Sequence, residues 1–224
     1  MANKLTRTVL AAYSGITIPM AAMGMPIAVY LPRFYSEGMG LSLVTVGTVF
    51  FIARIWDVVT DPIMGVMIDK FDSRWGRRKH WIALSIPILL LSVWMVFMPN
   101  PEDVSGLYLM FWLILLYAGY TMLAISHQSW GVELSKSYDD RSRLFGWREI
   151  FVIGGMAVVL AIPAAMELSG HSEQATKVAS MGWFCLILFP LLAIPTLLWV
   201  PDSHNKPGVT IPWQEAFKVL LANR

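Results

Sequence analysis

Residues 54–65 read Arg54-Ile55-Trp56-Asp57-Val58-Val59-Thr60-Asp61-Pro62-Ile63-Met64-Gly65 and lie inside a long apolar segment. Arg54, Asp57 and Asp61 recur at intervals of three and four residues, so they share one face of a helix. At the centre of a bilayer each such charge costs about 2.5–3.5 kcal/mol, so the three must pair or line a polar cavity. Pro62 removes a backbone donor and can free a carbonyl one turn back as a ligand. The stretch predicts a membrane-spanning helix with a functional polar face.

The composition of the whole chain requires a membrane. Of its 224 residues, 56% are hydrophobic and 14% are charged, and the mean hydropathy is +0.58. A single core of this size buries only about 70% of the surface, so this much apolar side chain needs lipid as a second solvent. A spanning helix takes roughly 20 residues, which leaves room for about six spans and excludes a sizeable soluble domain. The single cysteine, Cys185, excludes an internal disulfide.

We therefore expect an all-α membrane protein with six transmembrane helices in residues 1–200. The expected spans are residues 9–32, 43–68, 81–98, 107–134, 150–168 and 181–200. The first is too long for a signal peptide, whose apolar region has ~7–15 residues. With the N-terminus in the cytoplasm, the 17 Lys and Arg residues all fall inside except Arg33, Lys177 and Arg54. This asymmetry favours cytoplasmic N- and C-termini.

Residues 201–224 are expected to form a cytoplasmic connector with an amphipathic helix from Pro212. A disordered tail or the lead-in to another span are the alternatives for this segment.

The two acids of the second span repel each other when both are ionised. Asp57 and Asp61 lie one turn apart, so we expect them to titrate as a coupled pair. A proton, a Na⁺ ion or Arg54 would relieve the repulsion, as an ion-coupling site requires. The alternative is an Arg54–Asp57 pair that only fixes helix packing, with Asp61 neutral.

The fourth span carries a second polar stripe. Ser126, Trp130 and Glu133 share one helical face, with His127 and Gln128 beside them. Trp stacks on the apolar face of a sugar ring, and Ser, Gln and His can bond to its hydroxyls. The alternatives are that Trp130 is an interfacial anchor and His127 a packing residue.

The loop after the second span combines acidic, glycine and basic residues. Its five cations can bind anionic headgroups by charge alone. Asp69 at the helix end and Gly76 in a tight turn make the segment more specific than a run of charge. We expect a gating loop formed by Gly65, Asp69, Arg74, Gly76, Arg77 and Arg78.

This loop resembles the signature between helices II and III of the major facilitator superfamily. Residues 54–65 followed by Arg74-Trp75-Gly76 resemble, more narrowly, the glycoside-pentoside-hexuronide:cation symporters of the melibiose permease type. Gly40-Leu41-Ser42 and residues 133–148 fit the same family. Its members have twelve spans in two six-helix halves, with the substrate between them.

The resemblance covers the first half of that fold. Residues 216–224 resemble the segment that leads into the seventh helix. We therefore expect the N-terminal half of a major facilitator fold, either as a truncated reading frame or as a half-transporter. Its partner would be the missing C-terminal half or a second copy.

The resemblance also implies roles for individual residues. It places the coupling cation on Asp57 and Asp61, the sugar-stacking Trp at Trp130 and the Arg that enters the fifth helix at Arg148. The acids that hold galactosyl hydroxyls in the melibiose permease branch correspond to Ala21 and Ser126, so the resemblance does not carry galactoside specificity to this chain.

The coupling ion follows from two further positions. The family's extra Na⁺ ligands, an Asn and a hydroxyl of the fourth helix, correspond to Thr60 and Leu123. We therefore expect H⁺ as the coupling ion, with Na⁺ at Asp57 and Asp61 as the alternative.

The leading hypothesis is half of a cation-coupled symporter of the cell inner membrane. It would carry a sugar, a glycoside or a related organic solute by alternating access. Asp57, Asp61, Arg54 and Thr60 would form the cation site, and the substrate would meet Ser126, His127, Gln128, Trp130 and Arg148. No cofactor, resident metal or nucleic-acid partner is expected.

Two other readings belong to different classes. The first is a non-transporting six-helix scaffold or a degenerate transporter fragment. The second is an enzyme, which we do not expect. Ser126 and His127 are adjacent, so a helix points them ~100° apart, and no hydrolase motif surrounds them.

Overall fold

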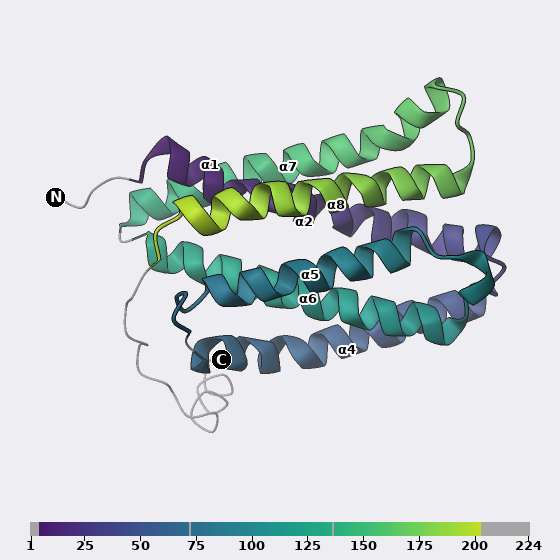
Figure 1. Ribbon diagram of the computed structural model, residues 1–224, viewed down its shortest axis with the longest axis horizontal. Coiled ribbons are helices and arrows are strands. Elements are labelled where there is room, and N and C mark those ends of the chain that lie inside the picture. Colours follow the sequence, from purple (N-terminus) through teal and green to yellow (C-terminus); the bar gives the residue numbers. More distant parts are fainter. Residues whose placement is uncertain (1–4, 72, 136, 203–224) are drawn as a thin grey trace, which may run out of the picture.

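Six long helical spans follow one another in the described parts of the chain, residues 5–71, 73–135 and 137–202 of the computed structural model (Figure 1). Each is long and apolar enough to cross a membrane. This confirms the prediction of an all-α membrane protein with six spans. The amphipathic helix expected from Pro212 lies outside the described residues.

The first span, Arg7–Gly38, is helical except for a turn at Ile16, and it is irregular. It consists of α1 (Arg7–Gly15), α2 (Thr17–Met25), α3 (Leu31–Arg33) and the π-helical turns Pro26–Tyr30 and Phe34–Gly38. Proline has no backbone N–H and interrupts the regular ladder, which explains the change of helical type at Pro26. The span is longer than the predicted residues 9–32.

Five regular helices complete the bundle. They are α4 (Leu43–Lys70), α5 (Lys79–Phe97), α6 (Gly106–Leu134), α7 (Tyr138–Leu168) and α8 (Gln174–Trp199), with a short 3₁₀ turn, Pro101–Asp103, before α6.

The fifth and sixth spans begin earlier than residues 150 and 181, where the hydropathy placed them. The Ser137 side chain caps α7 by accepting a hydrogen bond of 3.1 Å from the backbone N of Asp140. The basic residues Arg141, Arg143 and Arg148 therefore lie on α7 and not in a loop. Hydropathy did not reveal these first turns, because their charged side chains lower the mean hydropathy of any window that includes them.

The helices pack with α4 and α7 at opposite edges of the bundle (Figure 1). Helix α6 packs against both α4 and α5, and α7 packs against α2. Gly155 permits the close packing of α7 against α2, because a Cβ there would lie 2.5 Å from the backbone O of Ile18. In the most apolar stretch of 18 residues of a span, 17% of the residues are buried in α4 and likewise 17% in α7. The corresponding value for the first span is 61%. The polar face of α4 is therefore on an edge helix with little of the chain covering it.

Candidate functional site

The two acids of α4 meet a hydroxyl from α6. The buried Thr121 places its Oγ1 3.0 Å from Oδ1 of Asp57 and 2.8 Å from Oδ1 of Asp61. A hydroxyl carries one hydrogen, which it donates to one carboxylate or shares between the two. Three oxygen atoms from α4 and α6 thus converge here, and oxygen is the type of ligand that suits a proton or a hard cation.

Arg54 borders this pair on the open side. Its Nη1 lies 3.2 Å from Oδ2 of Asp57, and its Cζ lies 5.0 Å from the centre of the Tyr117 ring. The Arg54 side chain is 63% exposed and that of Asp57 is 15% exposed. Arg54 thus lies at an open face of the described chain, whereas Asp57 is largely covered.

Thr60 does not face the acids. Its hydroxyl donates to the backbone of its own helix, at 2.9 Å from the O of Trp56 and 3.2 Å from the O of Asp57. The structure thus brings together Arg54, Asp57 and Asp61 but turns the Thr60 hydroxyl elsewhere. Its part in a cation site stays a prediction.

Sequence reasoning missed Thr121. The resemblance assigned the hydroxyl position of the fourth helix to Leu123, whereas the residue of α6 that brings an oxygen to the acids is Thr121. Leu123 is fully buried in the apolar core, two residues further along α6. The only signal was a threonine in an apolar run, which a sequence cannot distinguish from a packing residue.

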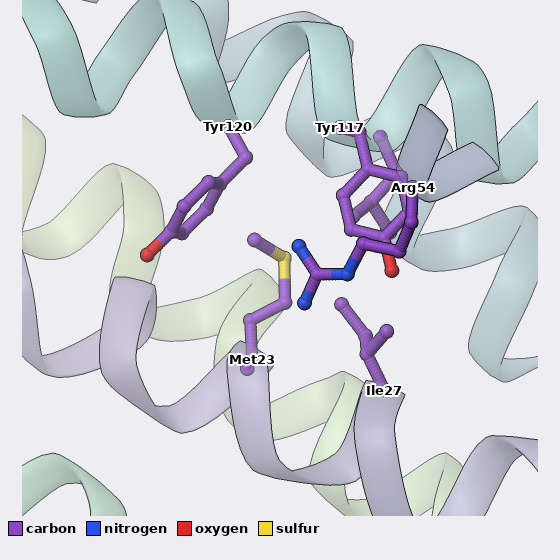
Figure 2. Close-up of a pocket in the computed structure, with 7 residues that line it drawn as sticks. Met23, Ile27, Arg54, Tyr117 and Tyr120 are labelled. Carbon is purple, nitrogen blue, oxygen red and sulfur yellow. The ribbon is translucent and has the colours of Figure 1, made fainter. Parts of the chain in front are cut away.

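Two neighbouring cavities lie between α2 and α6, and Arg54 lines the first of them. The first has a volume of about 170 Å³ and the second about 280 Å³, and Gly24 and Tyr120 line both. Figure 2 shows the Arg54 guanidinium between the tyrosine rings of α6 and the side chains of Met23 and Ile27.

The second cavity reaches α7. It is lined by Thr17, Met20, Ala21, Gly24, Met25, Tyr120, Arg148, Val152 and Met156. Arg148, which the resemblance made a substrate residue, therefore lies at a cavity.

The predicted substrate residues of α6 lie elsewhere. Ser126, His127 and Trp130 are fully buried, and Gln128 is exposed. None of the four lines either cavity. Their role in binding stays a prediction, and their environment favours packing in this conformation.

His127 and Trp130 form a buried cluster with Tyr13 of α1. The rings of Tyr13 and His127 stack with centres 4.0 Å apart. The Tyr13 hydroxyl donates to the backbone O of His127 at 2.7 Å, and Nε2 of His127 lies 2.8 Å from the backbone O of Tyr13. Trp130 meets Tyr13 edge to face and donates from Nε1 to the backbone O of Pro201 at 3.2 Å. We call these three residues the Tyr13–His127–Trp130 cluster.

The predicted gating loop is held by a buried arginine. The Arg78 side chain is 4% exposed; its Nε and Nη2 donate to Oε1 of Glu133 at 3.0 and 2.8 Å. Its Nη2 also lies 2.7 Å from Oδ1 of Asp69. Arg77 lies near the same two acids, at 3.5 and 3.7 Å. The loop therefore joins the ends of α4, α5 and α6.

The end of α8 reaches the same loop. Gly76 has a φ of +110°, and a Cβ there would lie 1.5 Å from Oδ2 of Asp202. The positive φ thus favours glycine, and a Cβ would also force the Asp202 side chain to move. Arg74 is exposed, and among the described residues no atom outside the backbone of α4 lies within 4 Å of where a Cβ on Gly65 would be. Sequence reasoning missed the contacts of Glu133 and Asp202, because both come from distant parts of the chain.

A family model described as MFS/sugar transport protein matches residues 12–224. The chain belongs to this family. The resemblance to the major facilitator superfamily and its glycoside/cation symporters is thereby confirmed. MFS/sugar transport proteins are transporters and not enzymes.

Relatives of this MFS/sugar transport protein carry transporter names. It is 27% identical to an isoprimeverose transporter of Lactiplantibacillus pentosus, over 88% of this chain and 43% of the relative. It is 29% identical to the uncharacterized symporter sll1374 of Synechocystis, over 88% and 37%. It is 26% identical to the inner membrane symporter YicJ of Escherichia coli, over 88% and 44%. The chain thus spans less than half the length of these curated relatives.

Proposed function

We propose that this chain is the cation-coupling half of a secondary transporter. The transporter carries a sugar, a glycoside or a related organic solute across the cell inner membrane by alternating access. The match to the MFS/sugar transport family supports transport in general, and relatives named as symporters support coupling. Both termini lie in the cytoplasm in this proposal, as the distribution of Lys and Arg favours.

The observation that carries the proposal is the contact of Thr121 with Asp57 and Asp61. Two carboxylate oxygens and one hydroxyl oxygen converge on a place where a proton or a cation would relieve the repulsion between the two acids. Because Arg54 pairs with only one oxygen of Asp57, the Oδ1 atoms remain available to the ion.

The coupling ion is proposed to be H⁺ or Na⁺. Two features of the sequence favoured H⁺: Thr60 in place of an Asn, and Leu123 in place of the hydroxyl residue of the fourth helix. Thr121 removes the second of these reasons, because it supplies an oxygen at both acids. Na⁺ therefore becomes an equal candidate, and the experiment has to vary both ions.

A second six-helix unit completes the transporter in this proposal. It would be the C-terminal half or a second copy of the chain. The polar face of α4 and the two neighbouring cavities lie where such a unit would close over them, because α4 is an edge helix. The loop cluster of Asp69, Arg78 and Glu133 would hold one end of the bundle together while the solute enters from the other.

The test is the substitution Asp61→Asn. It keeps the size of the side chain but removes the charge that attracts the ion. We expect cation-driven uptake of labelled isoprimeverose by vesicles from cells expressing the protein to fall by about 100-fold or more, which corresponds to about 2.7 kcal/mol. The gradient is imposed in one series with Na⁺ and in another with pH.

Asp103→Asn is the matched control, because Asp103 is an exposed residue of the 3₁₀ turn far from α4 in sequence. Unchanged uptake by Asp61→Asn would remove the coupling role. A protein that neither binds solute nor shows cation-linked flux with either ion would instead support the non-transporting scaffold.

A further inference from the structure

A separate cavity lies between the end of the first span, the end of α7 and the start of α8. It has a volume of about 360 Å³ and shares no lining residue with the two cavities between α2 and α6. The turn between α7 and α8 is at the end of the bundle opposite the start of α1 (Figure 1). In the expected topology this end faces the outside. Its polar lining residues are Tyr30, Arg33, Glu167, Ser172, Gln174 and Lys177.

Both cations that the expected topology leaves outside line this cavity, although Arg33 and Lys177 are far apart in the sequence. Each of them is paired with an acid. Nε of Arg33 donates to Oε2 of Glu37 at 2.7 Å, and Nζ of the largely covered Lys177 donates to Oε1 of Glu167. The two ion pairs carry no net charge, so the cavity does not select for a strongly charged solute.

The lining side chains keep hydrogen-bonding groups available for a ligand. An ammonium group has several N–H donors, and Lys177 uses one of them on its acid partner. The terminal nitrogens of Arg33 and the side chains of Tyr30, Ser172 and Gln174 bond to no residue in the described parts of the chain. A hydroxyl group both donates and accepts, so a solute with many hydroxyls suits a lining that offers donors and acceptors together.

The cavity also has an apolar side. Val29 and Tyr30 line it from the π-helical turn Pro26–Tyr30, and the buried Pro163 lines it from α7. Turns of this type are rare and are often found at functional sites. The ring of a tyrosine can pack on the apolar face of a sugar while its hydroxyl bonds to water or to the ligand. The volume is within the range of about 300–1,000 Å³ that is usual for small-molecule sites.

We propose that this cavity binds a polyhydroxylated solute without net charge, a sugar or a polyol, before the solute reaches the two cavities between α2 and α6. We call it the outer site. The inference rests on the proposed function, because a transporter that takes up such a solute meets it first at this end of the bundle.

The test uses one reactive cysteine at the outer site. Ser172→Cys places a thiol on an exposed lining residue, whereas the native Cys185 is fully buried. Spheroplasts that contain the protein are treated with a membrane-impermeant maleimide. The treatment is done with glucose, xylose, galactose or sorbitol, or with NaCl of equal osmolality. We expect at least one of the four solutes to slow labelling by about threefold or more, because a bound ligand covers the cavity lining.

Ser169→Cys is the matched control. It makes the same change at an exposed position of the same turn that does not line the cavity, so its labelling rate should not respond to any solute. Equal protection of both thiols, or protection of neither, would overturn the outer site. A Ser172→Cys thiol that reacts in detergent but not in spheroplasts would do the same, because a lipid headgroup would then fill the cavity or this end would face the cytoplasm.

A second variant assigns the protection to the lining. Lys177→Ala, added to Ser172→Cys, removes a largely covered donor, so the solute concentration for half protection should rise by about tenfold. Lys70→Ala makes the same change at an exposed position at the end of α4 and should leave that concentration unchanged. Thermal unfolding in detergent shows that each variant is folded. An equal effect of the two lysine variants would overturn the role of the lining.

Asp61→Asn separates the outer site from the proposed function. No residue of α4 lines the cavity, so protection of the Ser172→Cys thiol should persist in this variant. Protection that disappears with Asp61→Asn would come from the transport cycle and would overturn the outer site. Protection that persists while Asp61→Asn leaves uptake unchanged would support the outer site and overturn cation coupling.

Discussion

The polar groups of α4 and those of the Tyr13–His127–Trp130 cluster look alike in the sequence and differ in the structure. Both are polar side chains at helical spacing within apolar spans. The acids of α4 lie on an edge helix, with one hydroxyl and one exposed arginine as partners. The cluster lies inside the bundle, where the backbone satisfies the Tyr13 hydroxyl and one nitrogen of His127. Open polar groups with few partners are free to bind an ion, whereas enclosed ones hold helices together.

The largest expected effect falls on the enclosed cluster. Tyr13→Ala removes a fully buried ring that stacks on His127, so we expect a loss of about 3–5 kcal/mol in the free energy of unfolding. Unfolding in detergent measures it. Tyr138→Ala is the control, because that tyrosine is 85% exposed and should cost less than about 0.5 kcal/mol. A small loss at Tyr13 would mean that the cluster is not a packing element, and the comparison would fail.

The second prediction concerns Arg78, which is charged like the α4 residues and buried like the cluster. Arg78→Gln leaves Glu133 and Asp69 without their closest cation, and we expect about 3 kcal/mol of destabilisation. Arg74→Gln, at an exposed position of the same loop, should change stability by less than about 0.5 kcal/mol. Similar losses of stability for the two variants would show that burial does not decide how much a charged residue of this loop contributes to stability.

The third prediction concerns the link between α6 and the acids. Thr121→Val keeps the shape of the side chain and removes the hydroxyl, so we expect a loss of about tenfold in the affinity for the coupling ion, or about 1.4 kcal/mol. Titration of the ion dependence of uptake measures it. Thr121→Ser should restore most of the affinity. An unaltered ion dependence in Thr121→Val would remove the hydroxyl from the cation site.

The smallest effect is expected at Thr60. Its hydroxyl bonds to the backbone of α4, so Thr60→Val should change ion affinity by less than about twofold, or about 0.4 kcal/mol. The same uptake titration applies. A loss as large as that of Thr121→Val would show that the hydroxyl turns toward the acids when the ion binds.

The sequence predicted the number of spans and the polar face of α4 because both depend on local patterns. Length and hydropathy reveal a span, and spacings of three and four residues place Arg54, Asp57 and Asp61 together. The start of α7 was missed because its first turns are charged. A serine at position 137 does not by itself show that a helix begins there, because the cap is defined by the backbone conformation and its hydrogen bond.

The partners of each polar residue could not be predicted in this way. Asp61 and Thr121 are separated by 60 positions, and Arg78 and Glu133 by 55. Which face of α6 meets α4 is decided by the packing of all six spans at once. A polar stripe on α6 thus predicted a binding surface at Ser126, His127 and Trp130, and the structure encloses these three residues.

The sequence by itself determined a membrane protein with six spans, a charged helix face and a specific basic loop, because hydrophobicity, helical period and short motifs act over a few residues. The tertiary structure alone decided that Thr121 faces the acids, that Arg148 lines a cavity and that Trp130 is buried. These facts depend on contacts between distant segments, whose energies come from packing that no local pattern contains.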